Sequence, residues 1–469
     1  MLFTTITFFI FFCVFFILYW GISPKKSTWQ NFSLFIGSSF FYANFSWAFY
    51  LLLLMCIAIF YLLGHYIYQE KRENIRQYAM WGGILIGIGM LTYFKYMDFF
   101  INSFIHIARE LDFSFSTIPL EIIAPIGISF YTFKFISYLV DIYQDEYEPN
   151  EDILTFACYI LFFPSIVSGP IDRPKKLISQ FSIARNFNYT LAVDGCRQFL
   201  WGLFKKLVVA DNCVFIVNRG FEDITGYNGS TLLLGAMLYL IQIYADFSGY
   251  SDMAIGIGKV FGIRLTINFH YPLFAINIAD FWRRWHISLT SWMTDYIFTP
   301  LCFYWRRFRK AGIIAAVIIN FIIVGLWHGA NWTFVVYGLL NGMLFIPLIA
   351  KGTLNSQTSK HHIIKRSFTF LTMSLLVVFF KSNTLAQAFS YIKGIFSISL
   401  FYEPQISNKI IFIFTITMLS IEWINRNREH GLELSPVNNR ITRYIIYLVL
   451  IFLCFIFRGE VSEFIYQQY

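Results

Sequence analysis

The sequence predicts an all-α, polytopic membrane protein, and its composition supports this fold class. Hydrophobic residues make up 57% of the 469 residues, aromatic residues 21% and charged residues only 13%, whereas about 25% charged residues is usual in a soluble domain. A water-soluble globule of this size cannot bury so much apolar surface, and lipid is the solvent that accepts it. Inside a bilayer, helices satisfy their own backbone hydrogen bonds. The seven cysteines form no Cys-x-x-Cys pair and fit no disulfide scaffold.

Apolar segments that can cross about 30 Å of hydrocarbon, at about 1.5 Å per helical residue, follow one another along the chain. The first, residues 3–20, has no basic leader and no small-residue cleavage site, which indicates a retained anchor rather than a signal peptide. The further expected crossings lie near residues 46–64, 78–96, 121–143, 153–168, 231–249, 311–327, 332–350, 367–380, 409–424 and 444–457. We therefore expect roughly 11 transmembrane helices.

Two further segments, residues 31–44 and 97–112, are too short or too broken to span a bilayer simply. We expect them to form interfacial or re-entrant helices. No linker divides the chain, and no internal repeat is evident. The sequence therefore predicts a single integral-membrane domain over residues 1–469.

The net charge of +9 arises from 36 Lys and Arg against 27 Asp and Glu. The basic residues cluster in short loops, as is typical of cytoplasmic loops in a membrane protein, and no basic stripe alternates with stacking aromatics as in a nucleic-acid site. The clusters are Lys71, Arg72 and Arg76; Lys205 and Lys206; Arg306, Arg307, Arg309 and Lys310; and Lys360, Lys365 and Arg366. We therefore expect no nucleic-acid partner. We also expect both ends of the chain to lie on the outer side of the membrane.

His328 stands out among the ionisable residues, because apolar segments flank it on both sides, over residues 313–327 and 332–349. Ionisable groups inside membrane segments are costly and commonly functional. A low dielectric favours the neutral imidazole, which is the form that a general base needs. The alternative is a histidine that only bonds to a neighbouring helix, through Asn320 or Asn331.

A second polar cluster lies in Ile278-Ala-Asp-Phe-Trp-Arg-Arg-Trp-His-Ile-Ser-Leu289, within about two helical turns. Asp280 and Arg284 are four residues apart and are expected to pair on one helix face. Trp and Arg also anchor helices at a membrane interface, so the pattern is consistent with anchoring alone. Anchoring does not, however, require the imidazole of His286.

A third feature is Tyr244-Ala-Asp-Phe-Ser-Gly-Tyr-Ser-Asp252, where two carboxylates and two serines follow an apolar run. By itself it is consistent with a helix cap or with the wall of a polar cavity. Residues 254–262 contain glycines, but their spacing is not that of a phosphate-binding loop and no strand is expected before them. His361 and His362 lie in a basic loop, so we expect no metal site there.

Taken together, residues 244–252, 280–289 and 326–332 resemble the membrane-bound O-acyltransferase family, specifically its bacterial branch of alginate and peptidoglycan O-acetyltransferases. The likeness covers about residues 120–345. It extends upstream, in the same order, through Ala124-Pro-Ile-Gly-Ile-Ser-Phe-Tyr-Thr-Phe133, Phe163-Pro-Ser-Ile-Val-Ser-Gly-Pro-Ile-Asp-Arg173 and Gly202-Leu-Phe-Lys-Lys206. One departure follows Pro300, where this branch commonly has a glycine-rich segment and this chain has Leu301-Cys-Phe-Tyr-Trp-Arg-Arg307.

The resemblance implies a central funnel, at whose floor an acyl donor from the cytoplasm meets an acceptor hydroxyl from the other side. The family's central catalytic histidine corresponds to His328, and its second active-site histidine corresponds to His286. His328 would take the proton of the attacking hydroxyl, while His286 would orient the acceptor or stabilise the oxyanion. The resemblance favours acetyl-CoA as donor, with no bound cofactor. The residues expected to support this funnel are Asp246, Asp280, Arg284 and Asn331.

The end of the chain, Glu463-Phe-Ile-Tyr-Gln-Gln-Tyr469, resembles the Phe-Ile-Tyr ending of this branch and of the partner peptide in the related D-alanyl transfer system. In that system a tyrosine carries the acyl group, and Tyr466 occupies its place. We hypothesise that Tyr466 accepts the acyl group near His328 and presents it outside to a second protein or a glycan. The alternative is an aromatic belt at the membrane interface.

These features predict a bacterial inner-membrane O-acetyltransferase that passes an acetyl group from a cytoplasmic thioester to a cell-envelope polysaccharide of the peptidoglycan or alginate type. The expected partners are membrane lipid and an extracytoplasmic acetyltransferase or glycan acceptor. The main alternative is a transporter or flippase of an envelope precursor, although such proteins commonly contain internal repeats. A further alternative is a non-catalytic scaffold of an envelope-modifying complex, which would tolerate loss of both histidines.

Overall fold

The computed structural model describes residues 1–21, 26–111, 122–354, 362–405, 409–433, 439–459 and 464. These residues are all-helical and contain no β-strand, which confirms the predicted fold class. The chain forms two compact units. Unit 1 comprises Met1–Val193 and Ile257–Thr266, and unit 2 comprises Asp194–Gly256 and Ile267–Tyr469. A single domain over the whole chain stays a prediction.

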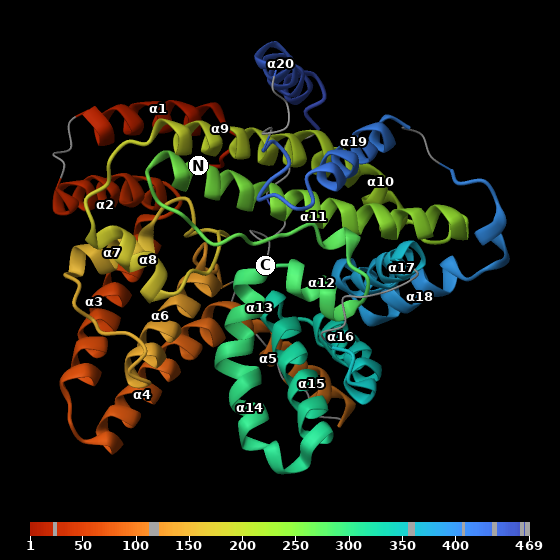
Figure 1. Ribbon diagram of the computed structural model, residues 1–469. Coiled ribbons are helices and arrows are strands. Elements are labelled where there is room, and N and C mark those ends of the chain that lie inside the picture. The colour runs from red at the N-terminus through yellow and green to blue at the C-terminus, as the bar shows by residue number, and fades with distance from the viewer. Residues whose placement is uncertain are drawn as a thin grey trace. The chain divides into compact units, whose positions relative to one another are not determined.

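Unit 1 contains the amino-terminal helices (Figure 1). They are α1 (Ile6–Gly21), α2 (Ser27–Ala43), α3 (Trp47–Gln69), α4 (Glu73–Leu91), η1 (Thr92–Tyr96), α5 (Met97–Glu110), α6 (Ile128–Tyr143), α7 (Ile153–Leu161) and α8 (Pro174–Ser182). α3, α4 and α6 pack against one another, and so do α2, α7 and α8. α1 lies beside α2, where Gly37 leaves room for the ring of Phe15.

Two helices, α9 (Tyr189–Phe204) and α11 (Gly229–Val260), have residues in both units. The remaining elements belong to unit 2. They are η2 (Lys205–Ala210), α10 (Asp211–Glu222), η3 (Pro272–Phe274), α12 (Ile278–Arg284), α13 (Ile287–Met293), η4 (Thr294–Phe298), α14 (Thr299–Tyr304), η5 (Arg306–Phe308), α15 (Arg309–His328), α16 (Trp332–Lys351), α17 (His362–Lys381), α18 (Leu385–Ile395), η6 (Ile398–Phe401), α19 (Ile410–Ile424) and α20 (Arg440–Ile456).

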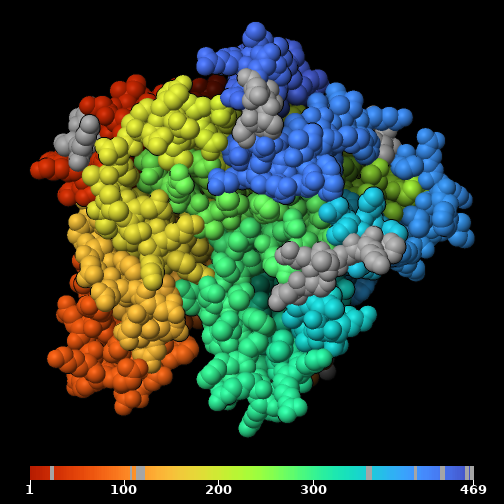
Figure 2. Space-filling model, in the orientation of Figure 1, coloured from red at the N-terminus to blue at the C-terminus, as the bar shows by residue number. Residues whose placement is uncertain are grey.

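Six helical segments of the described residues are long and apolar enough to cross a membrane. They are Trp47–Gln69, Glu73–Glu110, Gly229–Val260, Arg306–His328, Trp332–Lys351 and His362–Lys381. α1 and α19 are apolar but shorter, so the predicted number of 11 crossings is not established. Large apolar side chains are exposed on the surface, as lipid requires, and they include Phe303 of α14 and Phe308 of η5. In Figure 2 the green surface at the lower centre belongs to α14 and α15.

The crossing predicted over residues 153–168 is wrong. α7 has nine residues and is therefore only about 13 Å long, less than half of the hydrocarbon core of a bilayer. The helix stops before Pro164, because proline has no N–H to continue the ladder and disfavours helical backbone in the preceding residue. Residues 156–163 are buried, so their apolar character reflects packing inside unit 1 and not contact with lipid.

Three other boundaries differ from expectation. The helix predicted over 121–143 begins at Ile128, after Pro125 and after Gly127 in a left-handed conformation with φ of 76°. Residues 97–112 were expected to be a separate interfacial or re-entrant helix, but η1 joins α4 to α5 in one stretch of 38 residues. Residues 31–44 lie mostly in α2, a helix of 17 residues.

A close approach of α9 and α11 depends on glycines in unit 2. Gly195 and Gly202 on α9, like Gly249 and Gly256 on α11, are two helical turns apart and share a face. A Cβ atom on Gly249 would lie 2.8 Å from the carbonyl oxygen of Gly202, and one on Gly256 would lie 2.5 Å from that of Gly195. The two backbones therefore touch, and this contact places η2, which follows α9, against α11.

We expect Gly249→Ala to destabilise the protein by about 1–3 kcal/mol, because the added Cβ atom forces the two backbones apart. The measurement is the thermal unfolding midpoint of the purified protein in detergent. Gly82→Ala on α4 is the matched control, because a Cβ atom there meets nothing within 4 Å and alanine favours the helix. Equal midpoints for the two variants would contradict the close contact.

Candidate active site

α12 carries the first part of the polar cluster that the sequence singled out. Asn277 caps the helix and accepts a hydrogen bond of 2.8 Å from the Asp280 N–H. The predicted pair is confirmed: Nε of Arg284 lies 2.9 Å from Oδ1 of Asp280. The second oxygen of Asp280 accepts the N–H of Ile276 at 3.1 Å. Asp280 therefore ties α12 to the loop before it.

His286 lies between α12 and α13, in a left-handed conformation with φ of 48° and ψ of 50°. This conformation interrupts the helix, so that α12 ends at Arg284 and α13 begins at Ile287. The imidazole is completely buried, with its ring centroid 4.6 Å from that of Phe247 on α11 and 5.8 Å from that of Trp327 on α15. Burial lowers the pKa of His286 from its usual value near 6.5 to about 3. The ring is therefore neutral at physiological pH.

His328 is the last residue of α15 and is also buried. The predicted break follows it, because α16 starts at Trp332 and Asn331 caps that helix by accepting the Thr333 N–H at 3.0 Å. The amide of Asn331 also donates to the Asn383 carbonyl at 2.8 Å. The His328 ring lies 5.1 Å from Phe380 on α17. The depth of this break in a bilayer stays a prediction.

Trp327 brings the two predicted catalytic residues together. Its ring centroid lies 5.8 Å from that of His286 and 4.9 Å from that of His328. Two imidazoles that are 42 positions apart in the sequence thus share one aromatic neighbour. Trp282 of α12 reinforces the arrangement, because its Nε1 donates to Asn341 of α16 at 3.1 Å. The α12–α13 break therefore packs against the end of α15 inside unit 2.

A cavity of about 510 Å³ lies between α12, α13 and α15, and neither His286 nor His328 is among its lining residues. Its lining includes Ile287, which follows His286, and Val324, one helical turn before His328. Arg283 and Thr290 add polar groups to a largely apolar wall. A cavity of this size and chemistry is typical of a small-molecule site.

Asp246, a predicted supporting residue, takes part in a buried ion-pair cluster on the two lysines of η2. Nζ of Lys206 lies 2.7 Å from Asp246 and 2.8 Å from Asp211. Nζ of Lys205 lies 2.6 Å from Asp252 and also donates to Ser248 at 2.8 Å. Such pairs persist in a low dielectric because each charge has an opposite partner. In the structure Asp246 thus holds η2 against α11.

The sequence analysis missed Glu422 as a member of this cluster. Glu422 on α19 accepts a hydrogen bond from the Tyr244 hydroxyl at 2.9 Å and lies 3.9 Å from Nζ of Lys205. A lone carboxylate inside the apolar run 409–424 was the available signal, because such a group needs a partner. Trp327 was missed as the residue joining the histidines, since only the fold brings α12 beside α15.

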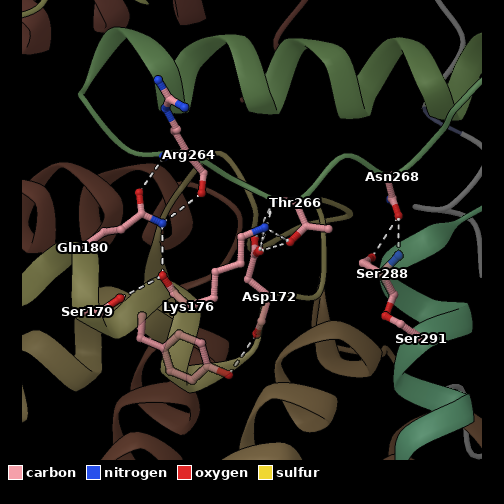
Figure 3. A network of polar contacts seen from close by, with 10 residues as sticks. Asp172, Lys176, Ser179, Gln180, Arg264, Thr266, Asn268, Ser288 and Ser291 are labelled. Atoms are coloured by element: carbon pink, nitrogen blue, oxygen red, sulfur yellow. Dashed lines mark hydrogen bonds and ion pairs between the residues drawn. The ribbon is translucent and has the colours of Figure 1, made fainter. Parts of the chain in front are cut away.

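In unit 1, a polar network around the buried Asp172 holds the chain that follows α11 (Figure 3). Asp172 accepts hydrogen bonds from both the hydroxyl and the N–H of Thr266, the latter at 3.0 Å. Lys176 donates to the Thr266 hydroxyl at 2.6 Å, and Gln180 pairs with the backbone of Arg264. Burial raises the pKa of Asp172, and the Thr266 hydrogen bond opposes that shift. The motif 163–173 therefore anchors residues 264–266.

Tyr466 lies outside the described residues. The tail is described up to residue 459 and at Phe464, and it packs on η2 in unit 2. The Gly459 N–H donates to the Leu207 carbonyl at 3.2 Å. Phe464 is buried, with its ring 5.0 Å from that of Tyr250 and 4.7 Å from Nζ of Lys206.

The part of the chain that the structure describes contains no group of three or more His, Cys, Asp or Glu residues that could hold a metal ion. No residue was predicted to bind a metal.

We expect the stability of the protein to fall as the pH drops from about 6.5 towards 3, in part through His286. The unfolded chain binds a proton near pH 6.5 while the folded His286 stays neutral, so each pH unit in this window costs up to about 1.4 kcal/mol. His286→Gln cannot take up this proton, so its unfolding midpoint should depend less steeply on pH in detergent. Parallel pH profiles for the two proteins would contradict a neutral buried imidazole.

Residues 151–381 match the family model of the membrane-bound O-acyltransferase family. The chain is 34% identical to the peptidoglycan O-acetyltransferase of Helicobacter pylori over 401 residues, which cover 79% of this chain and 74% of that protein. It is 34% identical to the probable alginate O-acetylase AlgI of Pseudomonas aeruginosa over 393 residues, 83% of this chain and 73% of that protein.

A more distant relative is the teichoic acid D-alanyltransferase of Bacillus subtilis, which is 31% identical over 239 residues, 48% of this chain and 59% of that protein. The matched family region contains both His286 and His328. These similarities favour an enzyme over a transporter or a scaffold. With six segments among its described residues that are long and apolar enough to cross a membrane, the chain is a multi-pass membrane O-acyltransferase and belongs to the membrane-bound O-acyltransferase family.

Proposed function

We propose that this enzyme moves an acetyl group from acetyl-CoA on the cytoplasmic side of a bacterial inner membrane to hydroxyl groups of a cell-envelope polysaccharide. The observation that carries the proposal is the pair of buried histidines whose rings both contact Trp327. The acceptor class follows the relatives, whose names specify peptidoglycan and alginate. A glycan, or an extracytoplasmic acetyltransferase that serves it, is the proposed partner.

In the proposed reaction, His328 removes the proton of the attacking hydroxyl as its oxygen bonds to the thioester carbonyl carbon. The C–S bond then breaks, and the thiolate of CoA leaves and takes up a proton. His286 orients the acceptor or donates a hydrogen bond to the oxyanion, for which its neutral form supplies one N–H. Asp280, Arg284 and Asn331 support the two histidines by holding the ends of α12 and α16.

His328→Ala should lower acetyl transfer by about 10²–10⁴-fold, because a positioned general base contributes that much. His286→Ala should lower it by about 10²–10³-fold, as expected for loss of one oxyanion donor. The measurement is transfer of labelled acetyl from acetyl-CoA to glycan in membranes with equal amounts of protein. His65→Ala is the control, because His65 lies on α3 in unit 1 and bonds to Tyr61 of its own helix. Wild-type transfer by His328→Ala would refute the proposed base.

We further propose that Tyr466 carries the acetyl group. Its phenol oxygen would attack the thioester and release CoA, and a glycan hydroxyl would then attack the aryl ester and restore the phenol. Tyr466→Phe should therefore abolish label on the protein and on the glycan. Tyr444→Phe, at an exposed tyrosine of α20, should leave both unchanged. Wild-type transfer to the glycan by Tyr466→Phe would eliminate the carrier.

A further inference from the structure

The backbone of His286 is in a conformation that does not persist unaided. Among the described residues that are not glycine, positive φ angles occur at Asp145, Tyr271, His286 and Arg309. Such a conformation is sterically disfavoured for an L residue and is maintained only when the surroundings hold it. At His286 it separates two helices that would otherwise follow one another directly, since α12 ends at Arg284 and α13 starts at Ile287.

The residue that holds this break is Asn268, in the loop between α11 and α12. Its carbonyl oxygen accepts the N–H of Ile287 at 2.8 Å. Its side-chain oxygen accepts both the N–H of Ser288 at 3.2 Å and the Ser288 hydroxyl at 2.9 Å (Figure 3). Asn268 thus receives three hydrogen bonds from the two residues that follow His286.

The other side of His286 is held by the same loop. The His270 N–H donates to the carbonyl oxygen of Arg284 at 3.0 Å. Asn268 is itself fixed to α11, because its amide donates to the Ser251 hydroxyl at 3.3 Å. Residues 268–270 therefore bracket His286 from both directions along the chain and connect it to α11.

Burial makes these hydrogen bonds decisive. Asn268 and His286 are 0% exposed and Ser288 is 1% exposed, so water does not compete for the donors of Ser288, and hydrogen bonds in such surroundings are strong. If the side-chain oxygen of Asn268 is removed, the N–H and hydroxyl of Ser288 need other acceptors. A right-handed helical backbone over residues 285–288 supplies them most simply, and it would join α12 to α13 in one helix. The imidazole would then leave its place between Phe247 and Trp327.

We propose that Asn268 is a positioning residue of the acyltransferase reaction. It holds the left-handed backbone of His286 and thereby keeps the His286 imidazole against Trp327, the ring that also contacts His328. Asn268 itself touches no substrate. The inference rests on the proposed role of His286, and it assigns a function to a residue outside the two histidine motifs.

The test compares Asn268→Leu, which keeps the branched shape of the side chain but has no acceptor, with Asn268→Asp, which keeps the acceptor oxygens. Asn268→Leu should lower kcat by about 10- to 100-fold, the effect of a misplaced catalytic group, and leave the KM for acetyl-CoA within about twofold. Asn268→Asp should lower kcat less than Asn268→Leu does. In a His286→Ala background, Asn268→Leu should lower kcat by less than about twofold, because the imidazole that Asn268 positions is already absent.

Asn31→Leu is the matched control. Asn31 is a buried asparagine of unit 1 that donates to Thr155 and to the Phe181 carbonyl at 3.0 Å each. Any loss of activity that Asn31→Leu causes through folding should combine multiplicatively with the loss caused by His286→Ala. The double variant should therefore show no coupling between the two changes.

A second measurement does not depend on activity. Diethyl pyrocarbonate modification, followed by mass spectrometry of the peptide, should spare the buried His286 in wild type and in Asn31→Leu, but modify it in Asn268→Leu. Retained protection in Asn268→Leu, or an activity loss that is the same in the His286→Ala background, would overturn the inference about Asn268 alone. Wild-type activity of His286→Ala would overturn the proposed role of His286, and the positioning role with it.

Discussion

Two adjacent lysines in an apolar interior are the constraint on which much of unit 2 depends. Lys205 and Lys206 are each 2% exposed, and a charge that deep is tolerated only with opposite charges at short range. The partners come from α11, α10 and α19: Asp246 and Asp252, Asp211, and Glu422. Both lysines open the π-helical segment η2, and such segments occur frequently at functional sites. Removal of Lys206 would take away the positive charge that both Asp211 and Asp246 contact.

The candidate site is built next to this cluster by interruptions of helices. α12 and α13 are separated by His286, and α15 ends at His328 just before the Asn331 cap of α16. Close packing keeps the second break in place, because a Cβ atom on Gly325 or Gly338 would clash with the backbone of the facing helix. Each catalytic candidate thus lies where a helix stops, and rigid neighbours determine its position.

Particular residues show how far sequence reasoning reaches. The Asp280–Arg284 pair follows from a spacing of four on one helix, and the structure contains it. The break after His328 also follows from local signals, since Gly329 interrupts the helix and Asn331 is a favourable cap. Hydropathy wrongly predicted a membrane crossing over residues 153–168, because a protein interior and lipid both favour apolar side chains. The role of Asn268 was not visible either, since an asparagine in a loop carries no sign of a bond to a residue 20 positions away.

The sequence alone determined that the protein lies in a membrane, that it is helical, which family it resembles and which two histidines are the catalytic candidates. Each of these depends on composition or on residues close together in the chain. The tertiary structure decided which apolar runs are long helices, which acid pairs with which lysine, and that Trp327 joins His286 to His328. It also decided the left-handed conformation of His286. These features arise from contacts between distant segments, whose energies depend on distance and burial, and neither quantity is encoded in local spacing.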